Sequence, residues 1–172
     1  AFVNPNTDLR DALTEEAARR ALAITKLGND YRPVGKVLDE KAFVNGIVGL
    51  LATGGSTNHT LHLPAMARAA GIELRWDDFD ELSRLVPLLC RVYPNGQADV
   101  NHFHAAGGMG FVISDLLKNG ILHPDLETIH TGGMAAYGTE PYLDDGKLAW
   151  RDAPADSQDE DILRPAEKAF SA

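Results

Sequence analysis

Apolar residues recur three and four positions apart along most of this 172-residue chain, and this spacing predicts a mainly helical fold. The first run predicts a helix that stops at Gly28, where a glycine follows the last apolar position. Its apolar positions are Leu9, Leu13, Ala17, Ala21 and Ile24. Residues 31–36 contain a proline and a glycine and predict a linker.

The second run, from Asp39 to Ala52, is apolar around most of the helix circumference, so we expect the largest buried helix of the chain here. A third helix is expected over residues 57–70, and Pro64 should kink it or restart it. Asp77 can cap a short fourth helix that ends before Pro87, because a carboxylate accepts a hydrogen bond from the first turn.

Glycine, proline and aspartate divide the next part of the chain. Residues 93–96, Tyr-Pro-Asn-Gly, predict a turn. Asp99 can cap a fifth helix over residues 100–106, which the pair Gly107-Gly108 can break. The helical pattern resumes over residues 109–119, with Gly120 at its end.

The helical pattern weakens towards the C-terminal end. Asp144-Asp145-Gly146 lies between two short apolar pairs and predicts a β-hairpin turn. Residues 152–161 are acidic and polar and predict an exposed loop. We therefore expect residues 1–172 to form an irregular helical array with little strand.

A polar corner at residues 53–59, Thr-Gly-Gly-Ser-Thr-Asn-His, joins the two central helices. Glycine takes a left-handed C-terminal position without a Cβ penalty, and a Ser, Thr or Asn side chain can cap the next helix. Open N–H groups at a helix N-terminus favour an anion or a polarised oxygen, whereas an ordinary helix–helix turn needs no ligand. The candidate binding residues are Gly54, Gly55, Ser56, Thr57 and Asn58.

Further glycines lie inside the predicted helices. Gly46 and Gly49 are in the second, and Gly107, Gly108 and Gly110 are around the fifth. Each costs about 1 kcal/mol relative to alanine in a helix interior. Close packing against another backbone is the interpretation we favour, and close approach of a ligand is the alternative.

Composition excludes several partners. The chain has 16 Lys and Arg against 25 Asp and Glu, a formal net charge of -9, and this balance argues against nucleic acid as a partner. It leaves a small anionic substrate possible, because such a substrate needs only a local positive site. No apolar run approaches the roughly 18 residues that span a bilayer. A single cysteine cannot form an internal disulfide and fits a cytoplasmic location.

Candidate metal ligands do not form a recognisable motif. His59 and His62 are three positions apart but lack the glutamate of the zinc-protease helix. His102 and His104 are two apart, so they point to different helix faces. Cys90 is surrounded by apolar residues and is expected to be a buried thiol. We expect no metal site within the chain.

The segment from Val44 to Leu63 resembles the central segment of the dihydroxy-acid and 6-phosphogluconate dehydratases. Residues 76–83 and 86–88 and the motif Ala106-Gly107-Gly108 fit the same family. The finer resemblance is to the 6-phosphogluconate branch rather than the branched-chain amino-acid branch, and it is carried by residues 93–96, 99–103 and 140–143.

This resemblance implies a hydro-lyase of the Entner–Doudoroff route, which removes water from 6-phospho-D-gluconate to give 2-dehydro-3-deoxy-6-phospho-D-gluconate. It implies an iron–sulfur cluster whose open iron acts on the leaving C3 hydroxyl, and a base that takes the C2 proton. The intact enzyme is expected to be a homodimer in the cytoplasm, and this segment to belong to a larger α/β N-terminal domain.

The chain has fewer cysteines than this resemblance implies. The resemblance implies three cysteine ligands upstream of this segment and a base in a C-terminal domain, and Cys90 matches no ligand motif. We therefore expect a fragment that is inactive alone, with its catalytic residues and cluster ligands outside the chain. Two alternatives stay open: a segment of a related dihydroxy-acid or sugar-acid dehydratase, or a non-catalytic helical interaction module.

Overall fold

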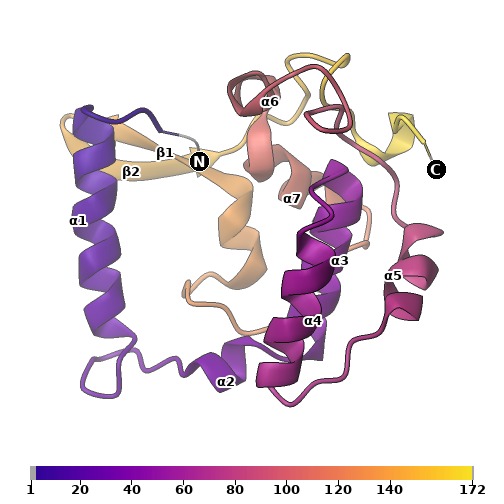
Figure 1. The fold of residues 1–172 in the computed structure, drawn as a ribbon. Helices are drawn as coiled ribbons and strands as arrows, with labels where there is room; N and C mark the ends of the chain where they lie inside the picture. Colours follow the sequence, from indigo (N-terminus) through magenta and orange to yellow (C-terminus); the bar gives the residue numbers. More distant parts are fainter. Residues whose placement is uncertain (1–2, 172) are drawn as a thin grey trace.

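The computed structural model describes residues 3–171, in which the chain is mainly helical with one two-stranded hairpin, as predicted. Figure 1 shows α1 standing apart from the group formed by α3, α4 and α5. The hairpin reaches α1 at one end, and the segment that contains α2 connects it at the other. The helices are α1 (Asp8–Ala23), α2 (Val34–Val37), α3 (Glu40–Thr53), α4 (His59–Ala69), α5 (Trp76–Ser83), α6 (Val100–Ala106) and α7 (Gly108–Lys118). Two 3-10 helices, η1 (Gly133–Gly138) and η2 (Ala166–Lys168), and the strands β1 (Thr139–Asp144) and β2 (Lys147–Asp152) complete the list.

Helix α3 is buried along its length, which confirms the prediction for this segment. The Asp39 side chain accepts a hydrogen bond from the Ala42 N–H at 2.8 Å and fixes the start of the helix. The apolar side chains that it buries are Phe43, Ile47, Val48 and Ala52. Buried side chains therefore lie on more than one side of α3, as the apolar circumference indicated.

The main core forms between α3, α7 and an extended segment at residues 88–92. The Leu89 N–H donates to the Ala52 carbonyl at 2.7 Å, and the Arg164 N–H donates to the Leu89 carbonyl at 2.8 Å. The extended segment is thus tied to the end of α3 on one side and to the C-terminal part of the chain on the other. Its buried members pack with Phe111, Val112, Leu116 and Leu163.

Several predicted boundaries were wrong. The first helix ends at Ala23, before the predicted stop at Gly28. The fourth helix begins at Trp76, and Arg75 rather than Asp77 occupies its N-cap position. The reason is that Asp78, in the first turn, accepts the Arg75 N–H at 2.7 Å, which fixes the start two residues earlier. The predicted linker at residues 31–36 contains the start of α2, because Pro33 has a φ of -66° that suits entry into a helix.

Proline and glycine explain the remaining elements. Helix α4 continues through Pro64 as one element and does not restart there. Asp99 caps α6 as predicted, and Gly107, with a φ of 137°, separates α6 from α7. Asp145 and Gly146 both have positive φ, 46° and 77°, as a type I′ turn requires, and the hairpin turn that the sequence predicted is confirmed.

The acidic loop contacts the body of the molecule at the end of α6. Most of residues 152–161 are exposed. The Gln158 N–H nevertheless donates to the Ala106 carbonyl at 2.9 Å, so the loop is fixed at that point.

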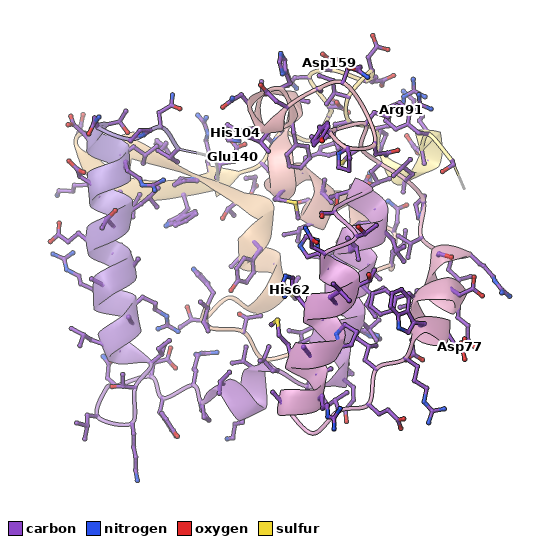
Figure 2. All side chains as sticks on the ribbon, viewed as in Figure 1. His62, Asp77, Arg91, His104, Glu140 and Asp159 are labelled. Carbon is purple, nitrogen blue, oxygen red and sulfur yellow. The ribbon has the colours of Figure 1, made fainter. Side chains whose placement is uncertain are left out.

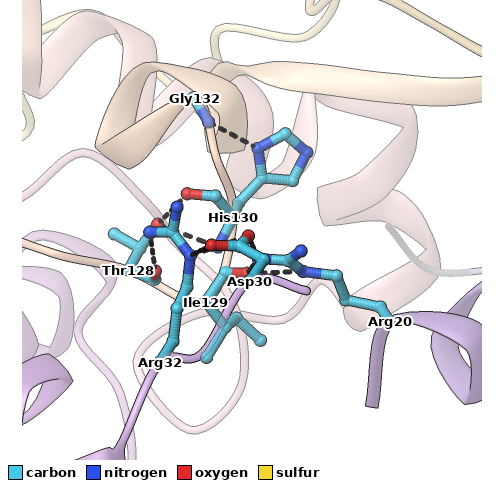
Figure 3. Close-up of polar contacts among 7 residues, drawn as sticks. All are labelled: Arg20, Asp30, Arg32, Thr128, Ile129, His130 and Gly132. Carbon is cyan, nitrogen blue, oxygen red and sulfur yellow. Dashed lines mark hydrogen bonds and ion pairs between the residues drawn. The ribbon is translucent and has the colours of Figure 1, made fainter. Parts of the chain in front are cut away.

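A cluster of charged side chains holds α1 to a distant loop (Figure 3). Asp30 lies 2.7 Å from Arg20 and 3.0 Å from Arg32. Arg20 Nε donates to the Ile129 carbonyl at 2.7 Å, and Arg32 Nη1 donates to the Thr128 carbonyl at 2.9 Å. No side chain of α1 is buried, so this polar cluster contributes much of what fixes the helix in place.

The attachment of α1 should depend on pH through Asp30. Hydrogen bonds from Arg32 and Arg20 lower the pKa of Asp30 below its ordinary value of 3.8. A carboxyl group with a lowered pKa stabilises the fold above its unfolded-state pKa, and this contribution is lost as pH falls through the folded-state pKa. We expect the amide exchange of α1, corrected for intrinsic rates, to accelerate below about pH 4.

The measurement is hydrogen–deuterium exchange of α1 peptides over this pH range in wild type and in Asp30→Asn, which should show little of the pH dependence. Asp11→Asn is the matched control, because Asp11 lies on the same helix and forms no ion pair in the described part of the chain. The same pH dependence in wild type and Asp30→Asn would contradict the prediction.

Candidate functional site

Gly54 is the residue that turns the chain at the polar corner. It has a φ of 58°, so it takes the left-handed position predicted for the end of α3. The Gly54 and Gly55 N–H groups donate to the Leu51 and Leu50 carbonyls at 3.2 and 3.0 Å. The last turn of α3 therefore uses both of these N–H groups itself.

The entry into α4 differs from the predicted cap. Asn58 occupies the N-cap position with helical dihedral angles, and its side chain forms no capping hydrogen bond. Ser56 Oγ accepts the Asn58 N–H at 3.2 Å, and the Ser56 and Thr57 carbonyls accept the next N–H groups, each at 3.0 Å. The tight 3-10-like turn brings backbone carbonyls into reach, so no side-chain cap from Asn58 is needed.

Few donors at the corner therefore point outwards. Within residues 3–171, the backbone N–H groups of the corner for which no acceptor lies in hydrogen-bonding distance are those of Ser56 and Thr57. Ser56 is half-buried, and Thr57 and Asn58 are exposed. The corner thus offers fewer open backbone donors than predicted, namely two adjacent N–H groups.

The turn at residues 93–96 braces the corner from outside. Asn95 Nδ2 donates to the Cys90 carbonyl at 3.1 Å, and this amide lies against Gly54. A Cβ added at Gly54 would lie 2.5 Å from Asn95 Nδ2 and 3.0 Å from Leu88 Cδ1. Gly54 is therefore required both for its positive φ and for the close approach of the turn.

An apolar cavity of about 420 Å³ lies beside the corner, between α3, α4 and α7. Thr53 and His59 line it, but the five residues between them do not. The predicted close packing of another backbone is not found at either glycine of α3. An added Cβ at Gly46 would lie 3.4 Å from the Leu63 side chain, an ordinary contact, and one at Gly49 would meet nothing within 4 Å. Both glycines line the cavity.

A second cavity of about 300 Å³ lies on the other side of Met109 and Ile113, which line both. Its walls come from α6, α7, η1 and the hairpin, and Figure 2 shows His104 and Glu140 next to each other at this place. The polar or aromatic residues that line it are His104, His130, Tyr137, Thr139, Glu140 and Trp150.

Sequence reasoning did not find this second site. It considered His104 only as a partner of His102, whose ring instead contacts Asp99 at 2.8 Å. Glu140 and Trp150 reach the cavity only because the hairpin folds back on α7. The glycines at 107, 108 and 110 were the available signal, since an added Cβ at Gly110 would lie 2.8 Å from Ala153 of the connection after β2.

The described residues do not form a metal centre. No group of three His, Cys, Asp or Glu side chains within residues 3–171 could hold a metal ion. Cys90 is fully buried, and burial raises the pKa of its thiol to about 12, so it is not a thiolate at neutral pH. His59 Nδ1 lies 3.0 Å from the Ser56 carbonyl rather than facing a second ligand.

Comparison with known proteins identifies the family. Residues 1–137 match the family model described as dihydroxy-acid/6-phosphogluconate dehydratase N-terminal. The chain belongs to this family. No helix in the described residues has the length and apolar character needed to cross a membrane.

Individual relatives are similar over the whole chain. The phosphogluconate dehydratase of Pseudomonas aeruginosa is 59% identical over 172 residues, which are 100% of this chain and 28% of that protein. The enzyme of the same name from Escherichia coli K12 is 54% identical over 99% of this chain and 28% of its own length. A dihydroxy-acid dehydratase from Cupriavidus pinatubonensis is 36% identical over a similar share. The chain spans little more than a quarter of the length of these curated relatives.

The double requirement at Gly54 yields a prediction for stability. Gly54→Ala should lower the free energy of unfolding by more than the roughly 1–2 kcal/mol that a left-handed non-glycine residue costs, because the new Cβ also displaces Asn95. Gly71→Ala is the matched control: Gly71 has a φ of 80°, but its added Cβ meets nothing within 4 Å. Urea unfolding of both variants measures the difference, and equal losses would show that the Asn95 contact does not matter.

Proposed function

We propose that the full-length protein that carries this chain is a 6-phosphogluconate dehydratase, a hydro-lyase of carbohydrate metabolism. It removes water from 6-phospho-D-gluconate and gives 2-dehydro-3-deoxy-6-phospho-D-gluconate, a step of the Entner–Doudoroff route. The supporting observation is the identity of 51–59% to relatives named phosphogluconate dehydratase, against 36% to the dihydroxy-acid dehydratase. The homodimer and the cytoplasmic location expected from the resemblance belong to the same proposal.

The iron–sulfur cluster implied by the resemblance does not fit the described residues. A cluster is held by several thiolates, and this chain offers one cysteine, which is buried and protonated. We infer that the cluster ligands and the catalytic base belong to other parts of the full-length protein. Residues 1–172 then contribute part of the wall of the active site and no catalytic group of their own.

For the polar corner, the proposed role is to bind an oxygen of the substrate or of the cluster side through Ser56 and Thr57. The supporting observation is the pair of adjacent N–H groups without an acceptor in the described part of the chain. Gly54 and Gly55 shape the turn, and Ser56 Oγ holds the Asn58 N–H. The alternative is that the corner is only a helix–helix turn, which has the same geometry and binds no ligand.

The full-length protein should dehydrate 6-phospho-D-gluconate with a kcat/KM at least about 100-fold above that for 2,3-dihydroxy-3-methylbutanoate, since a site built for polar groups rejects a substrate that lacks them. The isolated chain should show neither turnover nor a reconstituted cluster, because it lacks the thiolates. Keto-acid formation, together with visible absorption after anaerobic treatment with iron and sulfide, measures both.

The outcome separates the alternatives. Preference for the dihydroxy acid would favour a related dehydratase of the same family. Absence of turnover of either substrate by the full-length, reconstituted protein would favour an interaction module. A cluster with turnover in the isolated chain would contradict the inference that the ligands lie elsewhere.

A further inference from the structure

The cavity between α6, α7 and the hairpin contains a carboxylate without a close partner. The Glu140 side chain is only 19% exposed, and its nearest cation, Arg151 Nη2, is 3.8 Å away. That guanidinium is itself mostly exposed and lies over the Tyr142 ring. The carboxylate keeps some access to solvent, and no described residue donates a hydrogen bond to it, so its oxygens can accept hydrogen bonds from a ligand.

Two imidazoles face the same cavity with nitrogens available for a ligand. His130 Nδ1 accepts the Gly132 N–H at 3.0 Å, which places the proton of the neutral ring on Nε2 and makes that atom a donor. The His104 ring forms no hydrogen bond to any described residue. The two rings come from α6 and from the loop before η1, so the fold brings them to one cavity from distant positions.

The remaining walls favour carbon-bound hydroxyl groups over a metal or a phosphate. Trp150 supplies an aromatic surface for C–H groups, and Tyr137 supplies a hydroxyl. Thr139 Oγ1 donates to the Ala136 carbonyl at 2.6 Å and so can only accept from a ligand. No described set of His, Cys, Asp and Glu side chains has the arrangement of a metal site. A phosphate beside Glu140 would be repelled, whereas vicinal hydroxyls can donate two hydrogen bonds to a carboxylate.

We propose that this cavity binds the hydroxyl-bearing carbon chain of an acyclic sugar acid, with Glu140 as the acceptor that determines specificity and His104 as a further hydrogen-bonding group. The identity of the ligand rests on the proposed function, but the polyol chemistry of the cavity does not. A volume of about 300 Å³ accommodates a chain of six carbons. The phosphate and carboxylate ends of such a ligand lie away from Glu140.

The test compares Glu140→Gln with wild type in the full-length protein. The amide keeps the shape but loses the charge, so KM for 6-phospho-D-gluconate should rise roughly 10- to 100-fold, with kcat and the melting temperature little changed. Glu81→Gln is the matched control: Glu81 is exposed on α5 and does not line this cavity. Its KM should stay at the wild-type value.

Hydrogen–deuterium exchange gives a second measurement that does not need turnover. In wild type, 6-phospho-D-gluconate should protect peptides that cover residues 136–150, and inorganic phosphate should not. In Glu140→Gln this protection should be lost at the same ligand concentration. If Glu140→Gln folds poorly, the wild-type exchange pattern alone decides.

The outcomes separate this site from the proposed function. The site is overturned, and the dehydratase proposal stays in place, if Glu140→Gln turns over 6-phospho-D-gluconate with an unchanged KM. The same conclusion follows if the wild-type protein is active but 6-phospho-D-gluconate does not protect residues 136–150. If 6-phospho-D-gluconate protects residues 136–150 in wild type but not in Glu140→Gln, and the wild-type protein shows no turnover, the site is supported and the dehydratase proposal is overturned. Protection by inorganic phosphate alone overturns the polyol chemistry.

Discussion

Burial of one face of α7 is the constraint on which the rest of this structure depends. Phe111, Val112 and Leu116 are each at most 2% exposed, and burial of such side chains stabilises a fold by about 1.5–3 kcal/mol each. They pack against the end of α3 and against the extended segment at residues 88–92. Met109 and Ile113 of the same helix line both cavities, and Val112 and Leu116 also line the cavity beside the polar corner. The helix that makes the core therefore also forms a wall of both cavities.

The break between α6 and α7 makes this arrangement possible. Gly107 has a φ of 137°, which side-chain-bearing residues rarely adopt, and an added Cβ would lie 3.0 Å from Phe111 and 3.3 Å from Leu163. In a continuous helix, the directions of the His104 and Phe111 side chains would be fixed relative to each other by the helix periodicity. The break instead lets α6 present His104 to the hairpin cavity while α7 turns its apolar face into the core.

The polar corner and the hairpin cavity differ in how their polar groups are satisfied. At the corner, backbone carbonyls and Ser56 Oγ accept most of the N–H groups, and the turn at residues 93–96 packs against Gly54. In the hairpin cavity, Glu140 and His104 have little or no protein partner among residues 3–171. Both side chains keep some access to solvent, so a ligand that enters the cavity can form hydrogen bonds that no described residue supplies.

The sequence by itself determined the helical class, the buried segment from Asp39 to Ala52, the cap at Asp99, the hairpin turn at 144–146 and the family. These features depend on local rules, namely apolar period, capping side chains and glycine dihedral angles, which act over a few residues. Only the tertiary structure decided which corner donors stay open, that Gly49 faces a cavity, and that His104 and Glu140 line the same cavity. Each of these depends on contacts between segments far apart in the chain, and the residues that make those contacts cannot be read from the local sequence.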